Sequence, residues 1–216
     1  MNMKYSALIC AAGSGTRMKL GYNKVYAKLN DGQMIIDKTI NVFLNDMDCE
    51  EIVVVSDPDV FLEMHNGVID QRITLVQGGN TRQESVYHGL VKVKNSYVMI
   101  HDGARPFLNQ DLLDSIKNTL ATEDACLLMV PCKDTIKKVI DGYVETTYDR
   151  STLMAAQTPQ AFKTDLILSC TKKAMEENYT GTDDASLVEK YSDVKVKAVE
   201  GSYANIKITT IEDLKG

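Results

Sequence analysis

A chain of 216 residues is long enough to bury a substantial core, and we expect one domain over residues 1–216. The formal net charge of −6 argues against a general nucleic-acid-binding protein, which would usually carry a basic face. No apolar stretch is long enough to span a bilayer and no apolar signal core opens the chain, so we expect a cytoplasmic protein with no membrane partner. The cysteines form no Cys-x-x-Cys pair, which argues against a zinc site: Cys10, Cys49, Cys126, Cys132 and Cys170.

Short apolar runs alternate with segments of helical period along most of the chain. This rhythm predicts a Rossmann-like α/β fold, a mainly parallel sheet flanked by helices. The expected strands are residues 5–10, 52–55, 73–76, 97–100, 126–130, 194–200 and 204–209. The expected helices carry apolar faces at 36–47, 86–93, 112–120 and 166–175, with Thr164 as a cap and a short helix opening at 182–184. Thr81-Arg82-Gln83-Glu84 fits a capping box.

A glycine-rich turn follows the first expected strand and runs from Ala11 to Met18, with Lys24 shortly after it. Glycine lets backbone N–H groups approach a phosphate, and Arg17 and Lys24 place two cations nearby. The turn lacks the third glycine of the dinucleotide fingerprint and the Gly-Lys-Ser/Thr of a Walker loop. The pattern therefore favours phosphate binding only somewhat over an ordinary strand-to-helix turn with solvated basic residues.

The rhythm breaks after residue 132, where two β-rich runs of alternating polarity are joined by Asp141-Gly142. An Asp-Gly pair between such runs predicts a hairpin. The hairpin has too few apolar residues to belong to a core, so we expect a projecting arm at about 132–155. A projecting hairpin needs a covering partner, which makes a dimerisation arm plausible.

Polar clusters stand at the expected carboxyl ends of strands, where open parallel sheets bind ligands. They offer cations, hydroxyls and carboxylates but no nucleophile–base pair, which argues against acyl transfer. Asp102 is a good candidate Mg²⁺ ligand because Mg²⁺ typically takes one or two carboxylates plus substrate phosphates; an ordinary Asp-Gly turn is the alternative. Arg105 fits a substrate contact or a structural role equally well.

The chain resembles cytidylyltransferases that act on sugar or polyol phosphates, and the resemblance covers nearly its whole length. The motifs that carry it occur in the right order: Ala11–Met18 with Lys24, Gly78-Gly79 with Arg82 and Ser85, His101–Pro106, Gln157–Gln160, Gly181–Ser186, and Glu200–Lys207. Asn23, where many relatives have proline, and Asn80, where many carry an acid, depart from the pattern.

The resemblance implies a role for each motif. The implied catalytic residues are Arg17, Lys24, Arg150 and Lys207. The implied nucleotide-binding residues are Ala11, Ala12, Gly13, Ser14, Gly15, Gly79, Asn80, Ser85, Asp102 and Gly103. The implied residues for the second substrate are Arg105, Thr135, Arg150, Thr158, Thr182 and Lys207. Asp102 would also bind Mg²⁺, and the arm would interlock two subunits, so that Thr135 and Arg150 serve the partner's site.

The resemblance also implies the substrates, CTP and a polyol phosphate. The Ala-Ala-Gly opening favours a methylerythritol phosphate acceptor, used in isoprenoid precursor synthesis, over a ribitol 5-phosphate acceptor used in cell-wall synthesis. A nucleotide-binding regulator without turnover is an alternative that the joint presence of Arg17, Lys24, Asp102, Arg150 and Lys207 argues against.

Overall fold

The computed structural model describes residues 3–13 and 21–215. Within these residues, seven strands form one sheet in the order β3-β2-β1-β4-β8-β5-β9. The neighbours pair in parallel except at β8, which runs antiparallel to both β4 and β5. The bounds are β1 Tyr5–Cys10, β2 Cys49–Ser56, β3 Ile73–Gln77, β4 Tyr97–Asp102, β5 Ala125–Pro131, β8 Met154–Lys163 and β9 Lys197–Glu200. The mainly parallel α/β sheet predicted from the sequence is confirmed.

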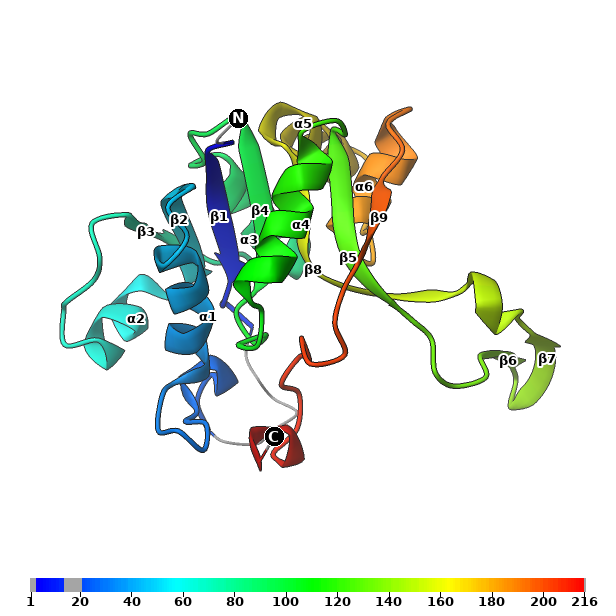
Figure 1. Cartoon of the computed structure of the whole chain (residues 1–216), viewed down its shortest axis with the longest axis horizontal. Helices are drawn as coiled ribbons and strands as arrows, with labels where there is room; N and C mark the ends of the chain where they lie inside the picture. Colours follow the sequence, from blue (N-terminus) through cyan, green and yellow to red (C-terminus); the bar gives the residue numbers. More distant parts are fainter. Residues whose placement is uncertain (1–2, 14–20, 216) are drawn as a thin grey trace.

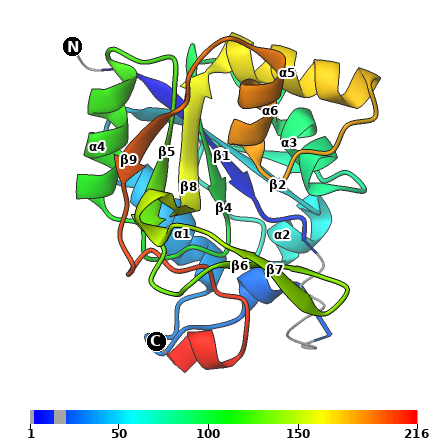
Figure 2. The ribbon, with the colours of Figure 1, turned by 90° about the vertical axis from the view of Figure 1, so that its right-hand side faces the viewer.

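Helices cover both faces of the sheet (Figures 1 and 2). One face packs against α1 (Ile35–Leu44), α2 (Pro58–Met64) and α4 (Gln110–Leu120), and the other against α3 (Arg82–Leu90), α5 (Thr164–Glu176) and α6 (Asp184–Tyr191). The unbroken apolar run in β2 follows from this arrangement, because Ile52 to Val55 are fully buried between two helical layers. The described residues also contain three short 3₁₀ turns: η2 (Lys24–Tyr26), η3 (Arg150–Thr152) and η4 (Glu212–Lys215).

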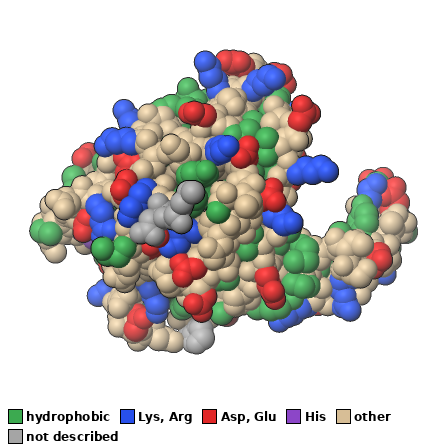
Figure 3. Space-filling model, turned by 45° about the horizontal axis from the view of Figure 1, so that its top comes forward, with side chains coloured by type: hydrophobic (Ala, Val, Ile, Leu, Met, Phe, Trp, Pro, Cys, Tyr) green, Lys and Arg blue, Asp and Glu red, His purple; other side chains and the backbone are tan. Residues whose placement is uncertain are grey.

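The predicted hairpin is present and projects from the body (Figure 1). It consists of β6 (Lys137–Ile140) and β7 (Tyr143–Thr147), joined by Asp141 and Gly142 with φ angles of 50° and 83°. Both residues occupy the left-handed region that a two-residue hairpin turn requires. Every residue of the two strands is exposed in the single chain, and apolar side chains cover parts of the arm (Figure 3): Ile136, Val139, Ile140, Tyr143 and Val144.

The sequence predictions missed or misplaced five single features. β8 and α2 were not predicted, residues 204–209 form no strand, and Met47 is 87% exposed rather than on the buried face of α1. Thr164 does not cap α5, because its hydroxyl donates to the carbonyl of Asn95.

The caps at the start of α3 and α6 are close to prediction. The Thr81 hydroxyl accepts a hydrogen bond from the amide of Glu84, but the Glu84 carboxylate accepts from Asn80 and not from Thr81. Asp183 and Ser186 form a reciprocal capping box on α6. Among the described residues, no helix has the length and apolar character needed to cross a membrane.

Candidate active site

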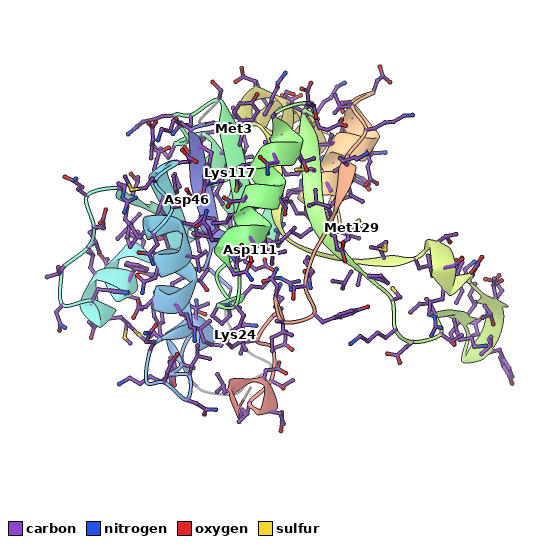
Figure 4. All side chains as sticks on the ribbon, in the orientation of Figure 1. Met3, Lys24, Asp46, Asp111, Lys117 and Met129 are labelled. Carbon is purple, nitrogen blue, oxygen red and sulfur yellow. The ribbon has the colours of Figure 1, made fainter. Side chains whose placement is uncertain are left out.

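A cavity of about 560 Å³ opens at the carboxyl ends of the central strands. Its walls come from the end of β1, η2, the loop that opens α3, the end of β4 and the segment after β9. Lys24, labelled in Figure 4, marks this end of the sheet. The described lining residues are Cys10, Ala11, Ala12, Gly13, Asn23, Lys24, Val25, Gly79, Asn80, Thr81, Arg82, Ser85, Asp102, Ala104 and Lys207.

Two glycines allow the strand ends to meet around this cavity. A Cβ on Gly78 would lie 2.3 Å from the Cβ of Ala12, so only glycine lets the loop after β3 approach the end of β1. A Cβ on Gly103 would lie 3.0 Å from the carbonyl oxygen of Cys10, which accepts a hydrogen bond from the Gly103 amide. Ser85 braces the same loop, since its hydroxyl accepts from the Gly79 amide and donates to the Thr81 carbonyl.

The start of η2 is fixed by side-chain hydrogen bonds. The Asn23 amide donates to the Ala11 carbonyl over 2.6 Å, and its oxygen accepts from the Val25 amide. The two hydrogen bonds of Asn23 thus restrain the backbone of this turn, as the ring of a proline would do by fixing φ. The Lys24 ammonium donates to the carbonyl of Ile208 over 2.6 Å, which joins η2 to the segment that carries Lys207.

Asp102 stands at the end of β4 and faces three cations. Its carboxylate lies 2.8 Å from Lys207 Nζ, 3.5 Å from Arg105 Nε and 3.8 Å from Arg82 Nε. Burial by itself would raise the pKa of Asp102, but Lys207, Arg82 and Arg105 outweigh it and lower the pKa to about 2. At neutral pH Asp102 therefore carries a full negative charge inside a ring of positive charge.

The loop after Asp102 is held from behind by Thr158 and His101. The Thr158 hydroxyl accepts from the Asp102 amide and lies 3.0 Å from His101 Nδ1, while His101 Nε2 lies 3.1 Å from the Arg105 carbonyl. Burial lowers the pKa of His101 to about 4, so the ring is neutral. A neutral ring that donates from Nε2 and accepts at Nδ1 satisfies both contacts.

Arg82 is a charged lining residue to which the sequence reasoning gave no role. Its guanidinium makes two hydrogen bonds to the buried carboxylate of Asp184, 2.7 and 2.9 Å long. Burial alone would lower the pKa of Arg82, but Asp184 raises it further above its usual range. Arg82 thereby ties α3 to α6 beside Asp102. The sequence feature that could have identified it as a site residue was its position in the Gly78–Ser85 motif.

The cavity offers limited means of holding a metal ion. Among residues 3–13 and 21–215, no cluster of three or more His, Cys, Asp or Glu side chains is placed to bind one. Asp102 is the one carboxylate in the described cavity lining. This donor set fits Mg²⁺ bound by one carboxylate together with substrate phosphates, and it does not fit an all-protein metal site.

Comparisons with known proteins match nearly the whole chain. A family model described as IspD, 2-C-methyl-D-erythritol 4-phosphate cytidylyltransferase, matches residues 5–216. The chain is 44% identical to the enzyme of that name from Bacillus velezensis, over 98% of this chain and 93% of the relative. It is also similar to the crystal structure of 4-diphosphocytidyl-2C-methyl-D-erythritol synthase from Anaerococcus prevotii, with a TM-score of 0.84, 34% identity and coverage of 99% and 96% of the two chains.

The chain belongs to the 2-C-methyl-D-erythritol 4-phosphate cytidylyltransferase family. This membership confirms the family predicted from the motifs. A second cytidylyltransferase of this name, from Francisella tularensis, has a solved structure with a TM-score of 0.84 and 31% identity, over 98% of this chain and 97% of that one. The fold and the family assignment therefore agree.

The residues predicted for this cytidylyltransferase site fall into three groups. Ala11, Ala12, Gly13, Lys24, Gly79, Asn80, Ser85, Asp102 and Lys207 line the cavity. Gly103, Arg105 and Thr158 adjoin it, the last two bonded to its walls. Thr135, Arg150 and Thr182 do not line it: Thr135 and Arg150 lie on the exposed arm, and Thr182 precedes the cap of α6. Ser14, Gly15 and Arg17 lie outside the described residues.

Proposed function

We propose that this chain transfers a cytidylyl group from CTP to 2-C-methyl-D-erythritol 4-phosphate, forming 4-diphosphocytidyl-2-C-methyl-D-erythritol and pyrophosphate for isoprenoid precursor synthesis by the non-mevalonate pathway. Family membership over residues 5–216 supports the reaction. The observation that carries it is the gathering of Lys24, Asp102 and Lys207 around one cavity with glycine-rich backbone. A cytoplasmic location stays a prediction from the sequence.

The proposed chemistry needs positioning and charge compensation more than acid–base catalysis. A phosphate oxygen of the acceptor attacks the α-phosphorus of CTP, the new O–P bond forms, and the bond to the β-phosphate oxygen breaks to release pyrophosphate. The attacking oxygen is already ionised at neutral pH, so no general base is required. Lys24, together with Arg17, would hold the triphosphate and offset the charge that develops on it.

Mg²⁺ fits the donor set of the cavity, with Asp102 as its protein ligand. Bound there with the CTP phosphates, it would supply charge neutralisation at the transferring group. Asp102 now shares its carboxylate with Lys207, so we propose that the Lys207 ammonium and the metal ion compete for it. On the other side of the cavity, the Gly79 amide and the Ser85 hydroxyl already bond to each other, and the Asn80 amide donates to the Glu84 carboxylate.

Two of the proposed acceptor ligands lie on the arm, which projects from the body (Figure 1) and contributes no residue to the described cavity lining of its own chain. We propose that the arm packs against a second copy, so that Thr135 and Arg150 complete the partner's site. The exposed apolar side chains of the arm support this, since an isolated two-stranded hairpin is marginally stable in water. Arg105 and Lys207 would contribute the acceptor contacts from the cavity side.

A shared site predicts complementation between inactive variants. Arg150→Ala and Lys207→Ala homodimers should both be inactive. Mixed dimers restore one intact site, so an equal mixture should regain up to about a quarter of wild-type turnover. Lack of any recovery after subunit exchange, with dimers confirmed by sedimentation, would contradict the shared site.

The acceptor is tested by measuring pyrophosphate release from CTP with each polyol phosphate in turn. Release with 2-C-methyl-D-erythritol 4-phosphate and none with ribitol 5-phosphate is the expected result. Preference for ribitol 5-phosphate would assign the chain to cell-wall synthesis. CTP binding without pyrophosphate release from either acceptor would indicate a regulator.

A further inference from the structure

The segment 201–207, which carries Lys207 into the cavity, is braced against the base of the arm. Tyr203 makes the main contact. Its hydroxyl donates to the carbonyl of Pro131, the last residue of β5, over 2.6 Å. The ammonium of Lys133, two residues further toward the arm, lies 3.6 Å from the centre of the Tyr203 ring. One aromatic side chain thus makes a hydrogen bond and a cation–π contact to the stretch in which β5 runs into the arm.

The same segment is held on its other side by the residues that surround Asp102. The Asn205 side-chain amide donates to the Thr158 carbonyl, and the Arg105 guanidinium donates to the Asn205 carbonyl over 2.8 Å. The Ile208 amide then donates to the carbonyl of Ala104. Lys207 is therefore fixed between the arm base and the Asp102 loop.

The first residues of the segment are tied to the sheet near Met129, which is labelled in Figure 4 on β5 just before that strand runs into the arm. The Gly201 amide donates to the Met129 carbonyl, and the Gln157 side chain donates to the Ser202 carbonyl. Tyr203 lies between these anchors and Asn205. Its contact with Lys133 extends beyond the last residue of β5 into the arm.

We propose that Tyr203 is a positioning residue, which couples the base of the arm to Lys207 and so sets the acceptor side of the cavity. The proposal deepens the proposed function and rests on it for its kinetic test. The Arg150 guanidinium donates to the Lys133 carbonyl. Arg150, which we propose serves the partner's site, is therefore bonded to the same residue whose ammonium lies over the Tyr203 ring. The contacts of Tyr203 thus link a group that serves one site of the dimer to Lys207 of the other.

The kinetic test uses Tyr203→Phe, which keeps the ring and removes the hydroxyl. Loss of one such hydrogen bond should raise the KM for the acceptor about fivefold, with kcat and the KM for CTP within about twofold of wild type. Lys133→Met, which removes the cation from the ring, should shift the acceptor KM in the same direction. Tyr87→Phe is the matched control: this half-buried residue of α3 does not line the cavity, and the structure gives its hydroxyl no hydrogen bond among the described residues.

The second measurement needs no turnover. In Tyr203→Phe, the amide of Ile208 should exchange with deuterium about fivefold faster, whereas amides in β1 should be unchanged. An unchanged acceptor KM together with unchanged exchange would overturn the proposal, as would a parallel rise in the KM for CTP. If wild-type protein releases no pyrophosphate with either acceptor, the proposed function fails, and the exchange measurement still decides the role of Tyr203.

Discussion

Replacing Asp102 with asparagine tests the charge arrangement at the centre of the cavity. Asparagine keeps the size of the side chain and removes its charge. It leaves Lys207, Arg105 and Arg82 facing a neutral amide at the same 2.8–3.8 Å separations. Without the carboxylate, these cations repel one another and lose their shared partner.

The magnitude follows from the lowered pKa of Asp102, about 2 in the folded protein against 3.8 in the unfolded chain. A carboxyl group whose pKa is lowered on folding stabilises the protein above the unfolded value, and the stabilisation is lost as pH falls through the folded value. Linkage gives about 2 kcal/mol at pH 7 and about 1 kcal/mol at pH 3. The side chain is only 10% exposed, so solvent screening reduces these figures little.

The assay is urea unfolding of wild type and Asp102→Asn between pH 3 and pH 7. The difference in unfolding free energy should be about 2 kcal/mol at pH 7 and should shrink by about half at pH 3. Asp134→Asn, at an exposed arm position with no ion pair among the described residues, is the control and should change the free energy by less than about 0.5 kcal/mol. A difference for Asp102→Asn that does not vary with pH would refute the electrostatic reasoning.

Three further predictions concern the nucleotide side, the support behind Asp102 and the arm. Lys24→Met should lower turnover with CTP on the order of 100-fold while circular dichroism stays unchanged, and near-normal turnover would remove Lys24 from the catalytic group. Thr158→Val, which leaves the Asp102 amide without its acceptor, should lower the free energy of urea unfolding by about 1–2 kcal/mol; a wild-type value would show that the contact is dispensable. Gly142→Ala places a side chain at φ 83° and costs about 1 kcal/mol, which should weaken self-association in sedimentation runs about fivefold, whereas equal association would argue against the arm as the contact.

Elements whose signals are local could be predicted from the sequence. β1 was predicted with its observed bounds because an apolar run is followed directly by a glycine turn. The hairpin was predicted because Asp141-Gly142 can adopt the left-handed angles that the turn needs.

Elements set by tertiary contacts were missed. β8 contains the polar, proline-bearing motif Gln157–Gln160, and it is a strand because β4 and β5 pair with it on both sides. Residues 204–209 alternate in polarity like a strand, yet hydrogen bonds from Lys24 and Arg105 fix them as an irregular segment. Asp57-Pro58 directly follows the end of β2, where the pair caps and begins α2.

In the predicted site, too, features with local signals were predicted and features set by tertiary contacts were missed. Motif residues at strand ends line one cavity because parallel strands bring their carboxyl ends to one edge. The engagement of Thr158 with the Asp102 amide could not be read from spacing, since it depends on the antiparallel placement of β8 beside β4. The same holds for Arg82, whose partner Asp184 is 102 positions away.

The bond from Lys24 to the Ile208 carbonyl joins positions 184 residues apart. Closing so long a loop costs entropy that other contacts must offset, so we expect this bond to form late in folding. During synthesis, Lys24 emerges long before its partner Ile208, so it waits for this contact while the intervening chain is made. With Lys24 in its proposed role, the ability to hold CTP depends on this late contact, and nucleotide binding can serve as a probe for the completion of folding in refolding experiments.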